Sequence, residues 1–128
     1  MLNKSNNAIL LVEDDESIRD LMVNIMIHNK YVPMTASCSE DALEIIKANE
    51  IDLAVINYGL PTDDGVTLAK KIEAIKPGLP TILMSGLNVK NSDCQIREAG
   101  INDVIQKPSR IENLLDKVRH SLASGVKV

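Results

Sequence analysis

The chain has 128 residues, enough for one domain whose hydrophobic core needs neither a disulfide nor a metal. The formal net charge is −4 and no basic cluster is present, which argues against nucleic-acid binding by this domain. The longest apolar runs, such as residues 8–12, fall far short of the roughly twenty residues that cross a membrane, so we expect a cytoplasmic protein.

Short apolar runs alternate with segments of helical period along the chain. The runs are too short for helices and are bounded by polar or turn residues, which is typical of buried strands. They cover residues 8–12, 32–36, 53–56, 81–84 and 104–105. With two Tyr and no Phe or Trp, the core between them must be aliphatic.

A helix is predicted after each run, from apolar residues that recur with helical spacing. In the first helix these are Ile18, Leu21, Met22, Ile25 and Met26, and in the last they are Ile111, Leu114, Leu115, Val118 and Leu122. The fourth helix, over residues 89–99, has the thinnest apolar face. Ser39 is expected to cap the second helix, and Asp64 the third.

Five strand–helix units predict an α/β fold with a single (βα)5 domain over residues 8–123 and short tails at 1–7 and 124–128. Connections between parallel strands are right-handed, which leaves few topologies. We therefore expect a doubly wound parallel five-stranded sheet of flavodoxin-like type, with strand order 2-1-3-4-5.

Polar side chains follow four of the predicted strands. Carboxyl ends of parallel strands share one edge of the sheet, where ligands bind in such folds. The residues expected there are Glu13, Asp14, Asn57, Ser85 and Lys107. Carboxylate and amide oxygens suit Mg²⁺, whereas a hydroxyl and an ammonium suit the oxygens of a phosphoryl group.

Five segments in this order and spacing resemble the signature of response regulator receiver domains, the CheY-like modules of two-component phosphorelay signalling. The segments are ILLVEDD (9–15), DLAVINYGLP (52–61), DG (64–65), ILMSG (82–86) and QKP (106–108). Together they place the resemblance over nearly the whole chain, from about residue 8 to residue 122.

The resemblance implies a role for each site residue. Glu13, Asp14, Asn57 and the Gly59 backbone carbonyl would hold Mg²⁺, and Ser85 with Lys107 would bind the phosphoryl group. It also implies partners rather than catalysis. A histidine kinase or phosphotransfer protein would dock near the first helix, and an output partner would read the face formed by helix 4, strand 5 and helix 5. A homodimer through that last face is left open.

Two residues depart from the family pattern. Asn57 occupies the position of the phosphorylated aspartate, and an amide is a poor nucleophile without negative charge. We therefore expect no phosphorylation by the usual route and weaker Mg²⁺ binding, whether Asn57 is native or an introduced Asp→Asn change. Val104 stands where receivers carry Tyr or Phe, so the usual hydroxyl-to-aromatic relay is in doubt.

The segment after the last helix gives no output domain, so we expect a stand-alone receiver or one excised from a hybrid histidine kinase or another multidomain regulator.

Other functions fit less well. A Mg²⁺-dependent phosphohydrolase would need a nucleophilic Asp after the first strand with a second Asp two residues on, which Asp14 and Glu16 do not match. A flavin protein would need a phosphate loop where this chain has three acidic residues.

Overall fold

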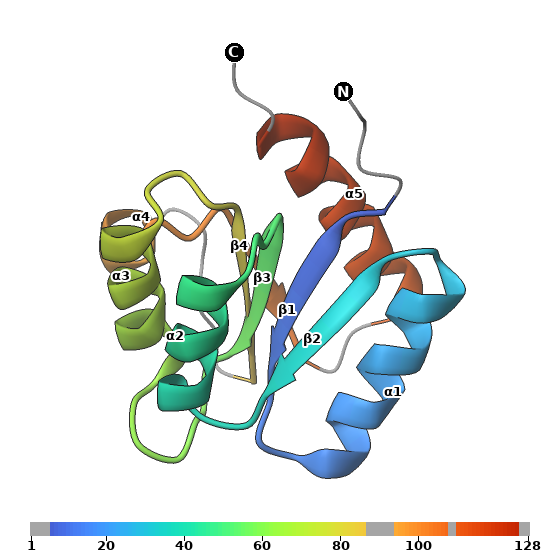
Figure 1. Ribbon diagram of the computed structural model, residues 1–128, viewed down its shortest axis with the longest axis horizontal. Coiled ribbons are helices and arrows are strands. Elements are labelled where there is room, and N and C mark those ends of the chain that lie inside the picture. The colour runs from blue at the N-terminus through green and yellow to red at the C-terminus, as the bar shows by residue number, and fades with distance from the viewer. Residues whose placement is uncertain (1–5, 87–93, 108–109, 126–128) are drawn as a thin grey trace.

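The computed structural model describes residues 6–86, 94–107 and 110–125, in which strands and helices alternate strictly (Figure 1). Five parallel strands form one sheet in the order β2-β1-β3-β4-β5, so the predicted fold and strand order are confirmed. The elements are β1 (Ala8–Val12), α1 (Glu16–His28), β2 (Val32–Ala36), α2 (Ser39–Ala48), β3 (Leu53–Asn57), α3 (Gly65–Ile75), β4 (Thr81–Ser85), α4 (Cys94–Glu98), β5 (Asp103–Gln106) and α5 (Ile111–Gly125).

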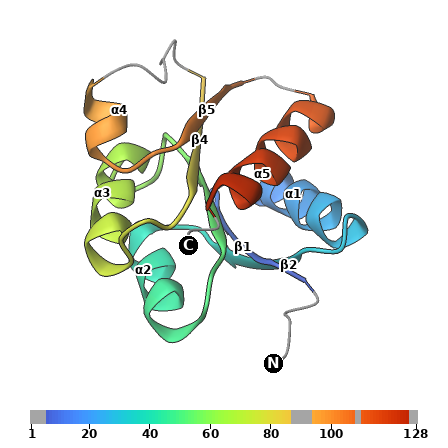
Figure 2. The same cartoon turned by 90° about the horizontal axis from the view of Figure 1, so that it is seen from above.

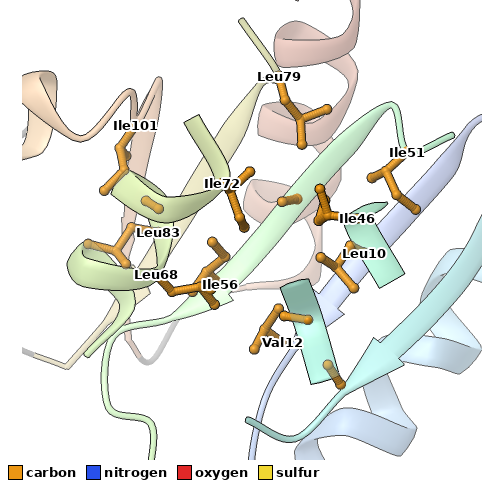
Figure 3. Close-up of a cluster of buried hydrophobic side chains, with 14 of the residues drawn as sticks. Leu10, Val12, Ile46, Ile51, Ile56, Leu68, Ile72, Leu79, Leu83 and Ile101 are labelled. Atoms are coloured by element: carbon orange, nitrogen blue, oxygen red, sulfur yellow. The ribbon is translucent and has the colours of Figure 1, made fainter. Parts of the chain in front are cut away.

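Helices cover both faces of the sheet, with α1 and α5 on one side and α2, α3 and α4 on the other (Figure 2). Side chains of successive strand residues point to opposite faces of the sheet, so the strands contribute to two core clusters, one on each face. The cluster beside α2 and α3 includes Leu10, Ile56, Leu83, Ile46 and Ile72 (Figure 3). The cluster beside α1 and α5 includes Ile9, Leu11, Val55, Met26 and Val118. Because the central strands are buried on both faces, they appear in the sequence as unbroken apolar runs.

Acidic side chains fix where two helices begin. The Asp15 carboxylate accepts a hydrogen bond from the Ile18 N–H at 3.1 Å and caps α1. The Asp64 carboxylate accepts one from the Thr67 N–H at 2.8 Å and caps α3, as the sequence predicted. Each cap satisfies a backbone donor that has no partner inside its helix.

The prediction that Ser39 caps α2 is wrong. The helix already includes Ser39, and Cys38 takes the extended cap position without a side-chain hydrogen bond. A capping residue must lie outside the helical turn, and Ser39 lies one residue too far in. Its hydroxyl is buried and has no hydrogen-bond partner among the described residues.

The apolar face predicted for α1 is only partly buried. Met22 and Met26 lie in the core, but Ile18 is 37% exposed and Leu21 54% exposed. The contact surface of α1 with the sheet is narrower than its apolar stripe. The remaining apolar side chains therefore face solvent beside α5.

The fourth helix is described only from Cys94 to Glu98, and the residues 89–93 predicted for its start lie outside the described part of the chain. Gly100 follows it with a φ of +82°, a conformation that glycine adopts readily. Across the described ranges, no helix combines the length and the apolar character needed to cross a membrane.

The sheet has β2 at one edge, and Pro33 lies within this strand. Val32 donates its N–H to the Asn7 carbonyl at 2.8 Å, and the Ala36 carbonyl accepts the Glu13 N–H at 3.0 Å. The backbone N–H and C=O groups of the even-numbered residues of β2 therefore point toward β1. Pro33 faces the open edge, where the missing N–H removes no bond of the sheet.

A close backbone approach joins the end of β3 to the start of α3. The Gly65 N–H donates to the Tyr58 carbonyl at 2.6 Å. A Cβ atom at Gly65 would lie 2.6 Å from the Asn57 carbonyl oxygen and 2.8 Å from Leu83 Cδ1, too close for a real side chain. Glycine is thus required here, and it sets the position of the loop that carries Gly59.

We expect Gly65→Ala to lower the free energy of unfolding by about 1–3 kcal/mol, because the added methyl group must displace backbone or core atoms. Denaturant unfolding measures the change. The matched control is Gly86→Ala, since a Cβ there meets nothing within 4 Å, and its effect should stay within about 0.5 kcal/mol. Equal effects of the two changes would contradict the close approach at Gly65.

Candidate functional site

The carboxyl ends of three strands bring four groups together. Glu13 follows β1, Asn57 ends β3 with Gly59 two residues further on, and Lys107 follows β5. Hydrogen bonds link these four residues, which we call the carboxyl-end cluster. Their sequence separations of 44 to 94 residues between strands show that the sheet topology, and not local structure, assembles the cluster.

The Asn57 amide lies at the centre of this cluster. Its Oδ1 accepts a hydrogen bond from Lys107 Nζ at 2.7 Å. Its Nδ2 donates to the Gly59 carbonyl at 2.8 Å and lies 3.4 Å from Glu13 Oε2. A lysine ammonium only donates, and a carbonyl or an ionised carboxylate only accepts. The neighbours therefore determine which end of the amide carries the nitrogen.

Glu13 is a buried carboxylate, with 2% of its surface exposed. Its Oε2 accepts the Asp15 backbone N–H at 3.1 Å, and its Oε1 lies 3.5 Å from Lys107 Nζ. The Arg19 guanidinium donates to the Glu13 backbone carbonyl at 3.0 Å. These contacts offset the cost of removing a negative charge from water.

The remaining predicted site residues are Ser85, Val104 and Asp14. Ser85 is fully buried at the end of β4, and its carbonyl accepts the Lys107 N–H at 2.7 Å. Val104 is partly buried on β5, in register with Leu83, and packs against the core beside α3. Asp14 is exposed to solvent, so its carboxylate is not turned inward like that of Glu13.

The cluster in this arrangement does not fit a divalent cation. Mg²⁺ needs oxygen lone pairs directed at one point. Here the Glu13 carboxylate and the Gly59 carbonyl accept hydrogen bonds from the Asn57 amide nitrogen, and the Asn57 amide oxygen accepts one from Lys107. Within the described ranges, no group of three or more His, Cys, Asp or Glu side chains is placed to hold a metal ion.

An apolar groove beside the cluster was not recognised from the sequence. It runs between α1 and α5, and Lys107 belongs to both the groove and the cluster. Its walls include Ile18, Leu21, Ile25, Arg110 and Ile111. Two features of the sequence could have indicated the groove. The apolar stripe of the first helix is wider than the surface that this helix buries against the sheet, and Ile111 adds an apolar residue at the start of the last helix.

Comparison with known proteins gives the same family as the motifs. The family model described as the response regulator receiver domain matches residues 9–119. The chain is 32% identical over 110 residues to a protein-glutamate methylesterase/protein-glutamine glutaminase from Paramagnetospirillum magneticum, which covers 83% of this chain and 29% of that protein. It is 32% identical over 127 residues to the regulatory protein VanR from Enterococcus faecium, covering 95% of this chain and 54% of VanR. The chain thus spans about half, or less, of these curated relatives.

Solved structures agree over almost the full length. A CheY-like response regulator receiver domain protein from Methanospirillum hungatei superposes with a TM-score of 0.88 at 27% identity, covering 94% of this chain and 97% of that one. The signal receiver domain of an HD domain-containing protein from Pseudomonas fluorescens gives 0.86 at 27% identity, with the same coverage. The motifs, the sheet order and these matches together show that the chain belongs to the response regulator receiver domain family of two-component signalling.

Proposed function

We propose that this receiver domain takes part in a phosphorelay by binding signalling partners, without accepting a phosphoryl group at position 57. The single observation that supports this is the Asn57 amide at the position where, by the family resemblance, the acceptor aspartate would stand. Its oxygen is bonded to Lys107 at 2.7 Å.

An aspartate is phosphorylated when a carboxylate oxygen attacks the phosphorus atom and the leaving group departs. An amide oxygen has no negative charge, and its nitrogen lone pair is delocalised into the carbonyl group, so neither end is an effective nucleophile. The other groups at this edge are a buried carboxylate paired with Lys107, a buried serine and exposed Asp14. We therefore assign this domain to binding and not to catalysis.

Receiver domains typically bind Mg²⁺, which neutralises charge on phosphoryl oxygens. In this chain Glu13, Asp14, the Gly59 carbonyl and the Asn57 oxygen would be the ligands. Hydrogen bonds inside the cluster already use Glu13, Gly59 and Asn57. We expect the affinity for Mg²⁺ to be low for that reason.

We propose two surfaces of the described part of the chain for partner binding. The groove between α1 and α5 opens beside Lys107 and exposes Leu21 and Ile111, of which 54% and 47% are accessible. We propose that a histidine kinase or phosphotransfer protein docks there, because apolar side chains of a partner would cover it and reach the cluster. An output partner, within a longer protein or as a separate chain, would contact the face of α4, β5 and α5, which carries the Asp103–Lys117 ion pair at 3.0 Å.

Incubation with Mg²⁺ and a small phosphodonor, followed by intact mass measurement, tests the proposal. The wild-type chain should gain no mass, whereas Asn57→Asp should gain one phosphoryl group, since the variant supplies a carboxylate nucleophile beside Lys107. Asn24→Asp makes the same chemical change at an exposed position of α1 and should gain none. A phosphoryl group on the wild-type chain would overturn the proposal. No gain in any of the chains would place the loss of phosphoryl chemistry beyond Asn57.

Without a phosphoryl group to bind, Lys107 still has a structural role. Its ammonium is the cation nearest the buried Glu13 carboxylate among the contacts described, and its side chain is 26% exposed. Removing one partner of a buried ion pair leaves an uncompensated charge, which costs more than the pair itself contributes.

We expect Lys107→Met, which keeps the apolar stem, to lower the free energy of unfolding by about 1–3 kcal/mol, less than for a fully buried pair. Lys71→Met is the control, because its partner Asp63 and Lys71 itself are 26% and 50% exposed, and it should cost no more than about 1 kcal/mol. Adding Glu13→Gln to Lys107→Met should restore part of the loss. No recovery in that double variant would show that Lys107 acts through some other contact.

A further inference from the structure

Two of the oxygens that the resemblance assigns to a metal, on Glu13 and Gly59, are bridged by one nitrogen atom. Asn57 Nδ2 lies 2.8 Å from the Gly59 carbonyl oxygen and 3.4 Å from Glu13 Oε2. A cation held by the same two oxygens would need their lone pairs, and it would need an oxygen of residue 57 in place of the N–H. The amide nitrogen and a cation therefore exclude each other.

Turning the amide by half a rotation does not resolve the conflict. The oxygen would then face Gly59 and Glu13, but the NH₂ group would meet the Lys107 ammonium, now 2.7 Å from the oxygen. Two donors facing each other lose a charge-assisted hydrogen bond. A carboxylate avoids this choice, because one of its oxygens can accept from lysine while the other faces a cation. An amide has a single oxygen, so a cation and Lys107 compete for it.

The charges of the cluster lead to the same conclusion. Glu13 and Lys107 carry opposite charges 3.5 Å apart, and Asn57 adds none. The cluster is thus close to neutral, whereas an aspartate at this position would add a negative charge beside Glu13. Asp14 and Asp15, the two acidic residues that follow Glu13, are both exposed.

We propose that the Asn57 amide nitrogen takes the place of the divalent cation in this receiver, bridging Glu13 to Gly59 and holding the loop after β3 without metal. The inference rests on the proposed function, because it treats position 57 as the position of the acceptor aspartate. It adds which contacts hold the loop after β3 in place. The held loop continues to Asp64, which forms a β-bridge with Gly59, and so to the start of α3.

Thermal unfolding in EDTA and in millimolar Mg²⁺ tests the proposal on the full chain. The melting temperature of the wild-type chain should be the same in both to within about 1 °C. Asn57→Asp should melt below the wild type in EDTA, because two carboxylates then face each other, and Mg²⁺ should raise its melting temperature by about 5 °C. Asn24→Asp should behave like the wild type. A wild-type shift as large as that of Asn57→Asp would overturn the proposal.

A second measurement needs only the wild-type chain to be folded. The side-chain NH₂ signals of Asn57 and Asn24 can be assigned by nuclear magnetic resonance from the signals lost in the two variants or from through-bond correlations. The Asn57 signals should exchange with solvent at least about tenfold more slowly than those of exposed Asn24 and should not move on addition of Mg²⁺. Fast exchange, or a shift with Mg²⁺, would overturn the bridge. Neither experiment contains a phosphodonor, so failure here leaves the mass measurement at position 57 unaffected, and the reverse also holds.

Discussion

A carboxylate buried at the end of a central strand needs a positive partner, and the arrangement of the site depends on that requirement. Glu13 directly follows β1 with 2% of its surface exposed, and the positive charge comes from Lys107, 94 residues further along the chain. Since β3 and β4 stand between β1 and β5, the lysine must reach across the end of the sheet. The Lys107 ammonium also donates a hydrogen bond to the Asn57 amide oxygen. One ammonium group therefore connects residues at the ends of three strands.

The same geometry indicates what the residue type at position 57 determines. Asparagine and aspartate have nearly the same shape, so we expect them to differ little in packing at the end of β3. They differ in hydrogen bonding, because an ionised carboxylate only accepts hydrogen bonds, whereas an amide accepts through its oxygen and donates through its nitrogen. With one oxygen and one nitrogen, Asn57 matches a lysine on one side and two acceptors on the other, which completes the cluster from the chain's own atoms.

Much of the fold could be predicted because the physical signals were strong. Strands buried on both faces produce unbroken apolar runs, and parallel strands carry their final residues to one edge, which is why Glu13, Asn57 and Lys107 could be expected together. What failed depended on finer spacing. Ser39 lies one residue inside its helix, and Leu21 belongs to the apolar stripe of α1 yet misses the sheet.

The orientation of the Asn57 amide lay beyond sequence reasoning for a different reason. It follows from which groups stand on either side of the side chain, and these come from β1, β5 and the loop after β3. Only the assembled sheet places a donor on one side and acceptors on the other. The groove between α1 and α5 is similar, since each helix alone shows only a wide apolar stripe.

Pro33 has a consequence for how this molecule can associate. One of the positions in the edge strand β2 that would offer a backbone N–H to a further strand is occupied by proline, the residue type that has none. Addition of a sixth strand at that edge, as in fibril growth or β-augmentation, therefore lacks one of its hydrogen bonds from the start. The Thr35 N–H remains on that edge, so a strand added there would pair with a shorter run of backbone hydrogen bonds than an edge without proline offers.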